Sequence, residues 1–266
     1  MKLEVILTPA EQPALAKRDL SETLCVVFDV LRATSTFVTA LHNGAKGIIP
    51  VSEISEALAI RKKQPDVLLG GERDGVKIRA AQSGGTAFDL GNSPRECTPE
   101  KVRGKAIVST TTNGTRALRA CAGAKTVLAG SFLNLGAMAE FIKKLRPAEV
   151  LLVCAGTRED RADEDVLAAG ALCEILDAPL SPLGRGEGVR RTGEGILQMT
   201  ESAEIARHFY ARAKSDLAAA VSNATNARRL LAIPELRDDV AFCLQHDVFP
   251  LIARMEADGV IRRQPA

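Results

Sequence analysis

The sequence predicts an α/β fold, in which buried strands alternate with helices along the chain. Two observations carry this prediction. Short runs such as residues 24–28 and 150–154 are apolar at every position, as strands covered on both faces are. Between such runs, apolar residues recur at helical spacing, for example over residues 134–145, which indicates helices with one buried face.

The composition agrees with this fold and limits the kinds of partner. Hydrophobic residues make up 46% of the 266 residues, so a large core can form without a metal or a disulfide. The 35 basic and 33 acidic residues are interspersed, and the chain has one tyrosine and no tryptophan, so a nucleic-acid surface is not expected. We therefore expect a small-molecule partner, and homodimer formation is left open.

The pattern of apolar runs and cysteines predicts a cytoplasmic protein that does not bind membranes. No apolar run approaches the length of a membrane span, and the first residues lack the pattern of a leader. The six cysteines form no Cys-x-x-Cys pair and are expected to be reduced. We expect one domain over residues 1–266, with two α/β lobes of about 1–125 and 126–266 as the alternative. A flexible insertion rich in Gly, Pro and Arg is expected near 178–195.

The elements follow in order from apolar runs, caps and helical spacing. The expected strands cover residues 3–7, 24–28, 47–51, 67–69, 106–108, 126–129 and 150–154. Ser52 is a suitable cap for a helix, and Ser93 with Pro94 and Glu96 forms a capping box for another. The later helices are expected over 134–145, 163–173, 202–214, 224–231 and 236–245, and a hairpin over 251–262 ends the chain.

One loop, residues 109–116, predicts an anion site. It follows the strand at 106–108 and reads Ser-Thr-Thr-Thr-Asn-Gly-Thr-Arg, with a turn pair before a helix. Unpaired N–H groups and the positive dipole of a helix start favour a phosphate or carboxylate, with Arg116 as its counter-charge. Threonine-rich loops are also common without any ligand. The candidate phosphate-binding residues here are Thr111, Thr112, Asn113, Gly114 and Thr115, with Arg116 as a candidate catalytic cation.

A second polar loop follows the strand at 24–28. It offers a carboxylate at Asp29, a guanidinium at Arg32 and hydroxyls at Thr34 and Ser35, at the carboxyl end of a strand, where open α/β sheets bind ligands. We interpret Asp29 and Arg32 as candidate catalytic residues. The alternative is that Asp29 only caps the following helix and Arg32 is its partner.

Acidic residues close to strand ends and helix starts predict a magnesium site. The three histidines fall outside every polar loop, and no Gly-x-Gly-x-x-Gly follows a strand, so zinc and dinucleotide chemistry have no support. Carboxylates are ligands that Mg²⁺ takes. The candidate ligands are Asp29, Glu72, Glu164, Asp165 and Asp239. For Glu164 and Asp165 the alternative is that they only interact with the dipole of their own helix.

Seven segments in order resemble the signature blocks of the 2-phosphosulfolactate phosphatases, the ComB family. They are residues 27–36, 71–73, 88–94, 111–116, 130–134, 154–156 and 164–166, and residues 238–243 resemble the family's closing block. The resemblance implies a three-layer α/β/α fold with a largely buried mixed sheet. It also implies a Mg²⁺-dependent phosphomonoesterase that releases sulfolactate and phosphate from 2-phospho-3-sulfolactate, a compound of coenzyme M or sulfolactate metabolism. Arg73 and Asn92, which lie in these blocks, join the candidate substrate-binding residues.

The chain departs from the family pattern at two places. Residues 79–86 lengthen the loop before Phe88, and the insertion around 180–195 has no counterpart. These departures bear on the substrate, so another small phosphorylated acid is also a candidate. Either water or Asp29 would be the nucleophile. The competing hypothesis is a non-catalytic binding protein for a small phosphorylated or sulfonated acid, which needs the arginines but not the clustered acids.

Overall fold

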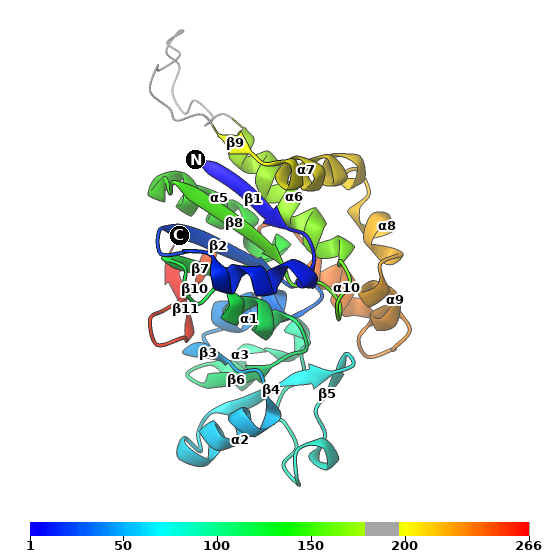
Figure 1. Ribbon diagram of the computed structural model, residues 1–266. Coiled ribbons are helices and arrows are strands. Elements are labelled where there is room, and N and C mark those ends of the chain that lie inside the picture. Colours follow the sequence, from blue (N-terminus) through cyan, green and yellow to red (C-terminus); the bar gives the residue numbers. More distant parts are fainter. Residues whose placement is uncertain (179–196, 266) are drawn as a thin grey trace.

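The computed structural model describes residues 1–178 and 197–265, in which one mixed sheet is covered by helices on both faces (Figure 1). The predicted α/β/α fold with a buried mixed sheet is therefore confirmed. In chain order, the strands are β1 (Lys2–Ile6), β2 (Thr23–Phe28), β3 (Gly47–Pro50), β4 (Leu68–Arg73), β5 (Val76–Lys77), β6 (Ala106–Thr110), β7 (Thr126–Gly130), β8 (Glu149–Cys154), β9 (Gln198–Met199), β10 (Leu251–Met255) and β11 (Ile261–Pro265). The insertion predicted near 178–195 lies, apart from its first residue, outside the described residues.

The helices connect these strands and cover the sheet. The α-helices are α1 (Ala33–His42), α2 (Ile54–Lys63), α3 (Pro99–Val102), α4 (Gly114–Ala120), α5 (Leu135–Leu145), α6 (Asp163–Asp177), α7 (Glu201–Ala213), α8 (Leu217–Ser222), α9 (Thr225–Leu231) and α10 (Arg237–Cys243). Four 3-10 helices are described as well: η1 (Pro9–Lys17), η2 (Ala80–Gln82), η3 (Pro94–Glu96) and η4 (Phe132–Asn134).

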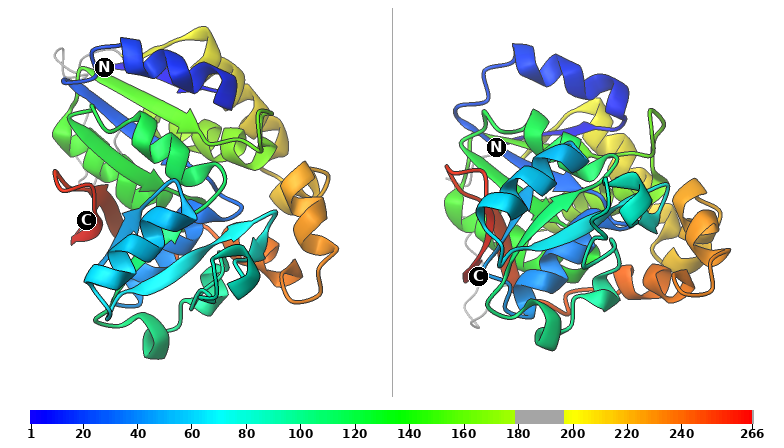
Figure 2. Two further views of the ribbon diagram at one scale, coloured as in Figure 1. Left: turned by 60° about the horizontal axis from the view of Figure 1, so that its bottom comes forward. Right: turned by 90° about the horizontal axis from the view of Figure 1, so that it is seen from below.

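The sheet consists of two parallel blocks joined by an antiparallel hairpin. Its strand order is β5-β4-β6-β3-β11-β10-β7-β2-β8-β1-β9. One block is β4-β6-β3 and the other is β7-β2-β8-β1, and β10 and β11 pair antiparallel with each other and with both blocks. Figure 2 shows α8, α9 and α10, in orange, at the end of the sheet toward which the β4–β5 ribbon points.

Alternating residues of the strands supply a core on each face of the sheet. Val26 of β2 packs in the cluster that contains α5 and α6, whereas Val27 packs in the cluster that contains α1 and α4. Every residue of β2 is buried, as its unbroken apolar sequence predicts. A third, smaller cluster holds α2 against β4 and β6.

Three local predictions need correction. The strand expected to stop at Leu69 continues through Arg73, because Gly71 passes so close to β6 that a Cβ there would lie 2.2 Å from the Thr110 carbonyl oxygen. The capping box at Ser93 does not form; the segment is the short helix η3, and the Ser93 hydroxyl donates to Asp239 instead. The helix η1 was not expected, because Pro13 interrupts its pattern.

The other predicted elements lie within a few residues of their predicted bounds, although the N-cap of α2 is Glu53 and not Ser52. The sequence did not predict β5, β9, α3, α8, η2 or η4. All six cysteines are buried and none forms a disulfide. Among the helices of residues 1–178 and 197–265, none combines the length and the apolar character that crossing a membrane requires.

Candidate active site

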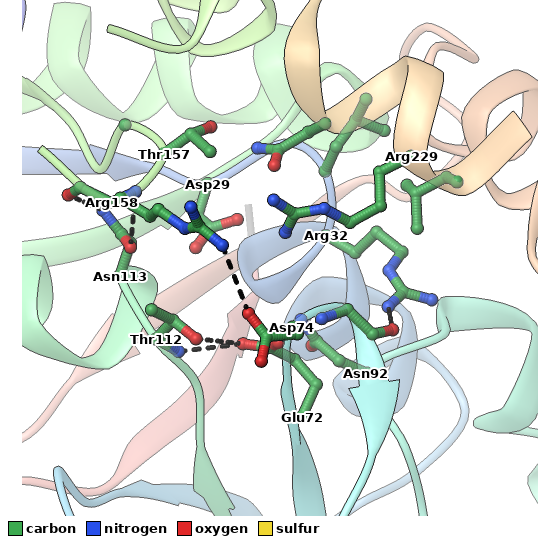
Figure 3. A pocket seen from close by; sticks show the side chains of 15 residues that line it. Asp29, Arg32, Glu72, Asp74, Asn92, Thr112, Asn113, Thr157, Arg158 and Arg229 are labelled. Carbon is green, nitrogen blue, oxygen red and sulfur yellow. Dashed lines mark hydrogen bonds and ion pairs between the residues drawn. The ribbon is translucent and has the colours of Figure 1, made fainter. Parts of the chain in front are cut away.

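A cleft opens where loops from both blocks of the sheet meet α9. Its walls come from the loop after β2, the β4–β5 turn, the loop after β6, the loop after β8, and α9 (Figure 3). The residues that line it include Asp29, Arg32, Glu72, Asp74, Asn92, Thr112, Asn113, Arg158, Asn226 and Arg229. The structure therefore brings together polar residues that lie far apart in the sequence.

Asp29 is the carboxylate that ends the central strand β2. It is buried, and its Oδ1 accepts a hydrogen bond of 3.1 Å from the Ala33 backbone N–H at the start of α1. Thr34 fixes the backbone of Asp29, because its hydroxyl donates to the Asp29 carbonyl oxygen at 2.9 Å. At the start of α4, only a glycine leaves room for the carboxylate, since a Cβ on Gly114 would lie 2.5 Å from Asp29 Oδ2.

Burial and neighbouring carboxylates disfavour the charged form of Asp29. Burial is the larger cause, and together with the charges of Glu72 and Glu164 it raises the pKa of Asp29 to about 7. Burial also raises the pKa of Glu164, and burial with the charge of Asp29 raises that of Asp165. Such a group of buried acids next to a cleft is a feature of functional sites, and a cation would favour their ionised forms.

Glu72 of β4 forms hydrogen bonds with the loop of residues 109–116, the threonine loop. Its Oε1 accepts hydrogen bonds from the backbone N–H and the hydroxyl of Thr112, at 2.9 and 3.0 Å. Its Oε2 accepts one of 2.7 Å from the Gly75 N–H. Both oxygens of Glu72 are therefore used in holding Thr112 and the β4–β5 turn in place.

Arg32 is held by a buried ion pair with Asp239 from α10. Its Nη1 lies 2.7 Å from Asp239 Oδ2, and both side chains are almost completely buried. The other oxygen of Asp239 accepts a hydrogen bond of 2.7 Å from the Ser93 hydroxyl. Nη2 of Arg32 donates to the Gly75 carbonyl oxygen at 2.5 Å. Asp239, a predicted metal ligand, thus has both oxygens engaged and orients Arg32.

Glu164 and Asp165 begin α6 but differ in what they contact. Asp165 accepts hydrogen bonds from the backbone N–H groups of Val30 and Gly156, at 2.8 and 3.0 Å, and so ties together the loops after β2 and β8. Glu164 Oε1 accepts one of 3.0 Å from Asn226. Glu164 Oε2 is buried and has no hydrogen-bond partner among the described residues. That oxygen lacks the partner that a buried charged atom requires.

Only part of the threonine loop faces the cleft. Thr112 and Asn113 line it, and Asn113 also bonds to the loop after β8, where its Oδ1 accepts from the Arg158 N–H at 3.2 Å. Thr111 and Thr115 bond to each other: the Thr115 hydroxyl donates to the Thr111 carbonyl oxygen at 2.9 Å. Their hydroxyls therefore stabilise the turn and do not line the cleft.

Other predicted substrate-binding and catalytic residues also lie outside the cleft. Thr34 is fully buried with its hydroxyl bonded to the Asp29 backbone, and Gly114 only leaves room for the Asp29 carboxylate. Arg116 is half exposed on α4, with Nη1 3.4 Å from Glu159 Oε1. Arg73 Nη2 donates to the Thr110 hydroxyl at 3.0 Å. The Ser35 hydroxyl donates to the Val30 carbonyl oxygen at 2.8 Å. The side chains of Arg73 and Ser35 therefore form hydrogen bonds within the protein. Arg116 projects into solvent because it lies on the exposed side of α4.

The sequence did not single out four of the charged and amide side chains that line the cleft. Asp74, Arg158, Asn226 and Arg229 come from the β4–β5 turn, the loop after β8, and α9. Arg158 follows the most apolar strand of the second half, so the rule that ligands bind at strand ends could have identified it. Asn226 and Arg229 lie on a helix whose sequence gives no such signal.

The donor set fits a hard cation, although the side chains as placed do not enclose one. Among the residues the structure describes, no group of three or more His, Cys, Asp and Glu side chains could hold a metal ion by itself. Mg²⁺ commonly binds one or two carboxylates and completes its shell with water and phosphate oxygens. Asp29 and Glu164 are the candidates, because each is an acid whose pKa is raised by burial and Glu164 has an unpartnered oxygen.

The fold and the cleft together define an α/β protein with the features of an enzyme that hydrolyses phosphate esters: buried acids, a positioned guanidinium and hydroxyl donors at strand ends. Residues 9–258 match the family described as 2-phosphosulpholactate phosphatase. The chain belongs to this family. The predicted resemblance is therefore confirmed over most of the chain, well beyond the seven short blocks.

Relatives that match this chain over most of its length carry the same description. A probable 2-phosphosulfolactate phosphatase from Caldanaerobacter subterraneus subsp. tengcongensis is 37% identical over 247 residues, which cover 92% of each chain. One from Thermotoga petrophila is 41% identical over 229 residues, covering 85% of this chain and 86% of that protein. One from Clostridium acetobutylicum is 32% identical over 253 residues, covering 95% and 96%.

Proposed function

We propose that the protein is a Mg²⁺-dependent phosphomonoesterase that hydrolyses 2-phospho-3-sulfolactate, or a similar small phosphorylated acid, to the hydroxy acid and phosphate. The observation that carries this proposal is the position of Asp29, a buried acid with further acids behind it and Arg32 beside it, in a cleft of a chain that belongs to this family. A binding protein without catalysis would need the arginines but would be weakened by these acids.

Arg32, Arg158 and Arg229 are proposed to bind the substrate. Arg32 is held by Asp239 and supplies a fixed positive charge for the phosphoryl oxygens, whose charge grows in the transition state. The N–H and hydroxyl of Thr112 both donate to Glu72, so Thr112 shapes the cleft wall. Arg158 and Arg229 border the cleft and supply cations for the carboxylate or sulfonate of the acid.

Asp29 and Glu164 are the residues we propose to hold Mg²⁺. A bound Mg²⁺ would neutralise phosphoryl charge and favour the ionised forms of both acids. In the overall reaction the oxygen of water bonds to phosphorus, the P–O ester bond breaks, and the leaving oxygen takes a proton. We assign the attack to water because Asp29 is proposed as a ligand of the metal, and the single-turnover experiment below separates the two nucleophiles.

Phosphate release from 2-phospho-3-sulfolactate and 2-phospholactate tests this function. We expect turnover with Mg²⁺, loss of turnover after exhaustive chelation, and recovery when Mg²⁺ but not Zn²⁺ is restored. Full activity after chelation would rule out the metal dependence. A single turnover of substrate that is radiolabelled in its phosphoryl group, quenched with acid, should leave no label on the protein. Label on Asp29 would show that Asp29, and not water, attacks the phosphorus.

A further inference from the structure

A second cavity adjoins the cleft and shares three of its wall residues. Arg32, Gly75 and Asn92 border both spaces. The cleft offers about 60 Å³ for the centres of water-sized molecules, and the second cavity offers about 350 Å³. Because one water needs about 10 to 15 Å³ by this measure, the cleft holds a few waters or a phosphoryl group, and the rest of a substrate must extend beyond it.

The second cavity is lined largely by apolar side chains. They come from β5 and the segment after it, and from the connection between α9 and α10; they are Val76, Ile78, Ala80, Ala87, Ile233 and Leu236. Val76 remains 37% exposed, although it is apolar and close to the cleft. A ligand that covered these side chains would remove apolar surface from water, which favours binding.

Three of the five charged side chains that line the second cavity are engaged by the protein itself. Lys77 Nζ donates to the Asp89 carbonyl oxygen at 2.7 Å, and Glu96 Oε2 accepts from the Gly91 N–H at 2.9 Å. Arg32 is paired with Asp239. The other two, Arg79 and Glu235, carry opposite charges. With Arg32 neutralised by Asp239, the charges of the wall balance, so its apolar side chains favour an uncharged apolar group.

Asn92 lies at the junction of the two spaces and has an unused hydrogen-bonding group. It is buried, with 6% of its surface exposed, and its Oδ1 has no partner among the described residues. The unpaired oxygen calls for a hydrogen-bond donor, and the NH₂ group of the same amide can donate to an acceptor such as a carboxylate. A phosphorylated acid would then have its phosphoryl group in the cleft, its carboxylate near Asn92, and its substituent directed into the second cavity.

The segment between β5 and Phe88 also borders the second cavity. Arg79, Ala80 and Ala87 of this segment lie in the cavity wall. We infer that this cavity is a specificity pocket for an apolar substituent on the carbon that bears the phosphate ester. The substrates it selects are phosphate esters of 2-hydroxy acids with a branched or aromatic side chain. This inference rests on the proposed phosphatase function.

The test is kcat/KM for phosphate release from a graded series of esters. The series is 2-phosphoglycolate, 2-phospholactate, the phosphate ester of 2-hydroxyisocaproate, and 2-phospho-3-sulfolactate. Each buried methylene is expected to raise kcat/KM by about fourfold. The isobutyl compound should therefore exceed 2-phospholactate by about tenfold or more.

A matched pair of variants on the same segment locates the effect. Ala87→Trp fills the cavity and should remove the preference for isobutyl over methyl, leaving a ratio of about one, because no additional methylene would be buried. Ala81→Trp adds the same side chain to an exposed position that does not line the cavity, and should leave the preference unchanged. The melting temperatures of both variants show whether each one folds. If a variant does not fold, the series of esters measured on the unaltered chain still tests the specificity pocket.

The outcomes separate this inference from the function on which it rests. Hydrolysis of 2-phospho-3-sulfolactate or 2-phospholactate without any gain for the isobutyl ester would overturn the specificity pocket and leave the phosphatase intact. An isobutyl preference that survives Ala87→Trp would also overturn it. If the chain released phosphate from no ester in the series, both the proposed function and the inference would fail.

Discussion

Two arginine–aspartate pairs border the same cleft, one at its inner end and one at its rim. Arg32 Nη1 lies 2.7 Å from Asp239 Oδ2, with 3% and 0% of the two side chains exposed. Arg158 Nη2 lies 3.5 Å from Asp74 Oδ1, with 70% and 81% exposed. Both pairs join a guanidinium to a carboxylate, but they differ in burial and in the distance between the charged atoms.

The difference in burial indicates different tasks. Removing one partner of a buried pair leaves a charge without compensation, which costs about 3 to 5 kcal/mol, whereas an exposed pair contributes about 0 to 1 kcal/mol. Arg32 is therefore fixed before substrate arrives, as transition-state stabilisation requires. Arg158 can leave Asp74 at little cost and turn to an anionic group of the substrate. We infer that the residues at the inner end of the cleft perform the chemistry and that the residues at its rim bind the substrate.

The largest effect is expected at the inner end, for Asp29→Asn. The amide keeps the size of the side chain but cannot supply the negative charge that we propose for metal binding, so kcat should fall by about a thousandfold or more. The melting temperature should change little. Kinetics beside a thermal melt check this, and a variant that kept most of its rate would show that Asp29 only caps α1.

Breaking the two pairs compares them directly. Asp239→Ala should lower the free energy of unfolding by about 3 to 5 kcal/mol, because Arg32 would remain buried without a counter-charge. Asp74→Ala is the matched change at the rim and should alter it by less than about 1 kcal/mol. Denaturant unfolding of both variants gives these values. Equal losses would mean that burial does not distinguish the pairs.

At the rim, substitutions should affect binding more than turnover. Arg158→Ala and Arg229→Ala each remove a cation from the cleft wall but leave Asp29 and Arg32 in place, so KM should rise about tenfold with kcat within about threefold. The effect should shrink at high salt, and more for the exposed Arg158 than for the half-buried Arg229. A fall in kcat as large as that of Asp29→Asn would place these arginines at the inner end.

The smallest effect is expected for Arg116→Ala. The sequence pattern predicts that this arginine binds phosphate, and its loss would then cost one to three powers of ten. In the structure Arg116 is half exposed, lies next to Glu159 and does not line the cleft, so kcat/KM should stay within about twofold. A larger loss would restore Arg116 to the site and would require α4 to turn when substrate binds.

The elements and the strand-end residues could be predicted because their signals are local. An unbroken apolar run is enough to identify β2, and the residue that ends it, Asp29, follows directly. The same rule identified Arg32 and Thr112, which lie in the cleft. Glu72 was expected in a loop and lies in β4, yet its side chain still reaches the predicted threonine loop.

The remaining parts of the site depend on contacts between distant segments. Asp239 pairs with Arg32 across 207 positions, and nothing local marks it as a partner for an arginine. The choice between Arg116 and Arg158 depends on how α4 is rotated about its axis, which a turn motif does not specify. Arg229 reaches the cleft only because α9 packs at that end of the sheet.

The binding of Mg²⁺ at the inner end is the central claim, and a thermal shift tests it most directly. A ligand that binds only the folded chain stabilises it by RT ln(1 + [L]/Kd), so saturating Mg²⁺ should raise the melting temperature by several degrees. Asp29→Asn should abolish this rise, and Arg116→Ala, the matched change outside the cleft, should keep it. No rise in the unaltered chain, or an equal rise in Asp29→Asn, would contradict the assignment of these buried acids to a metal.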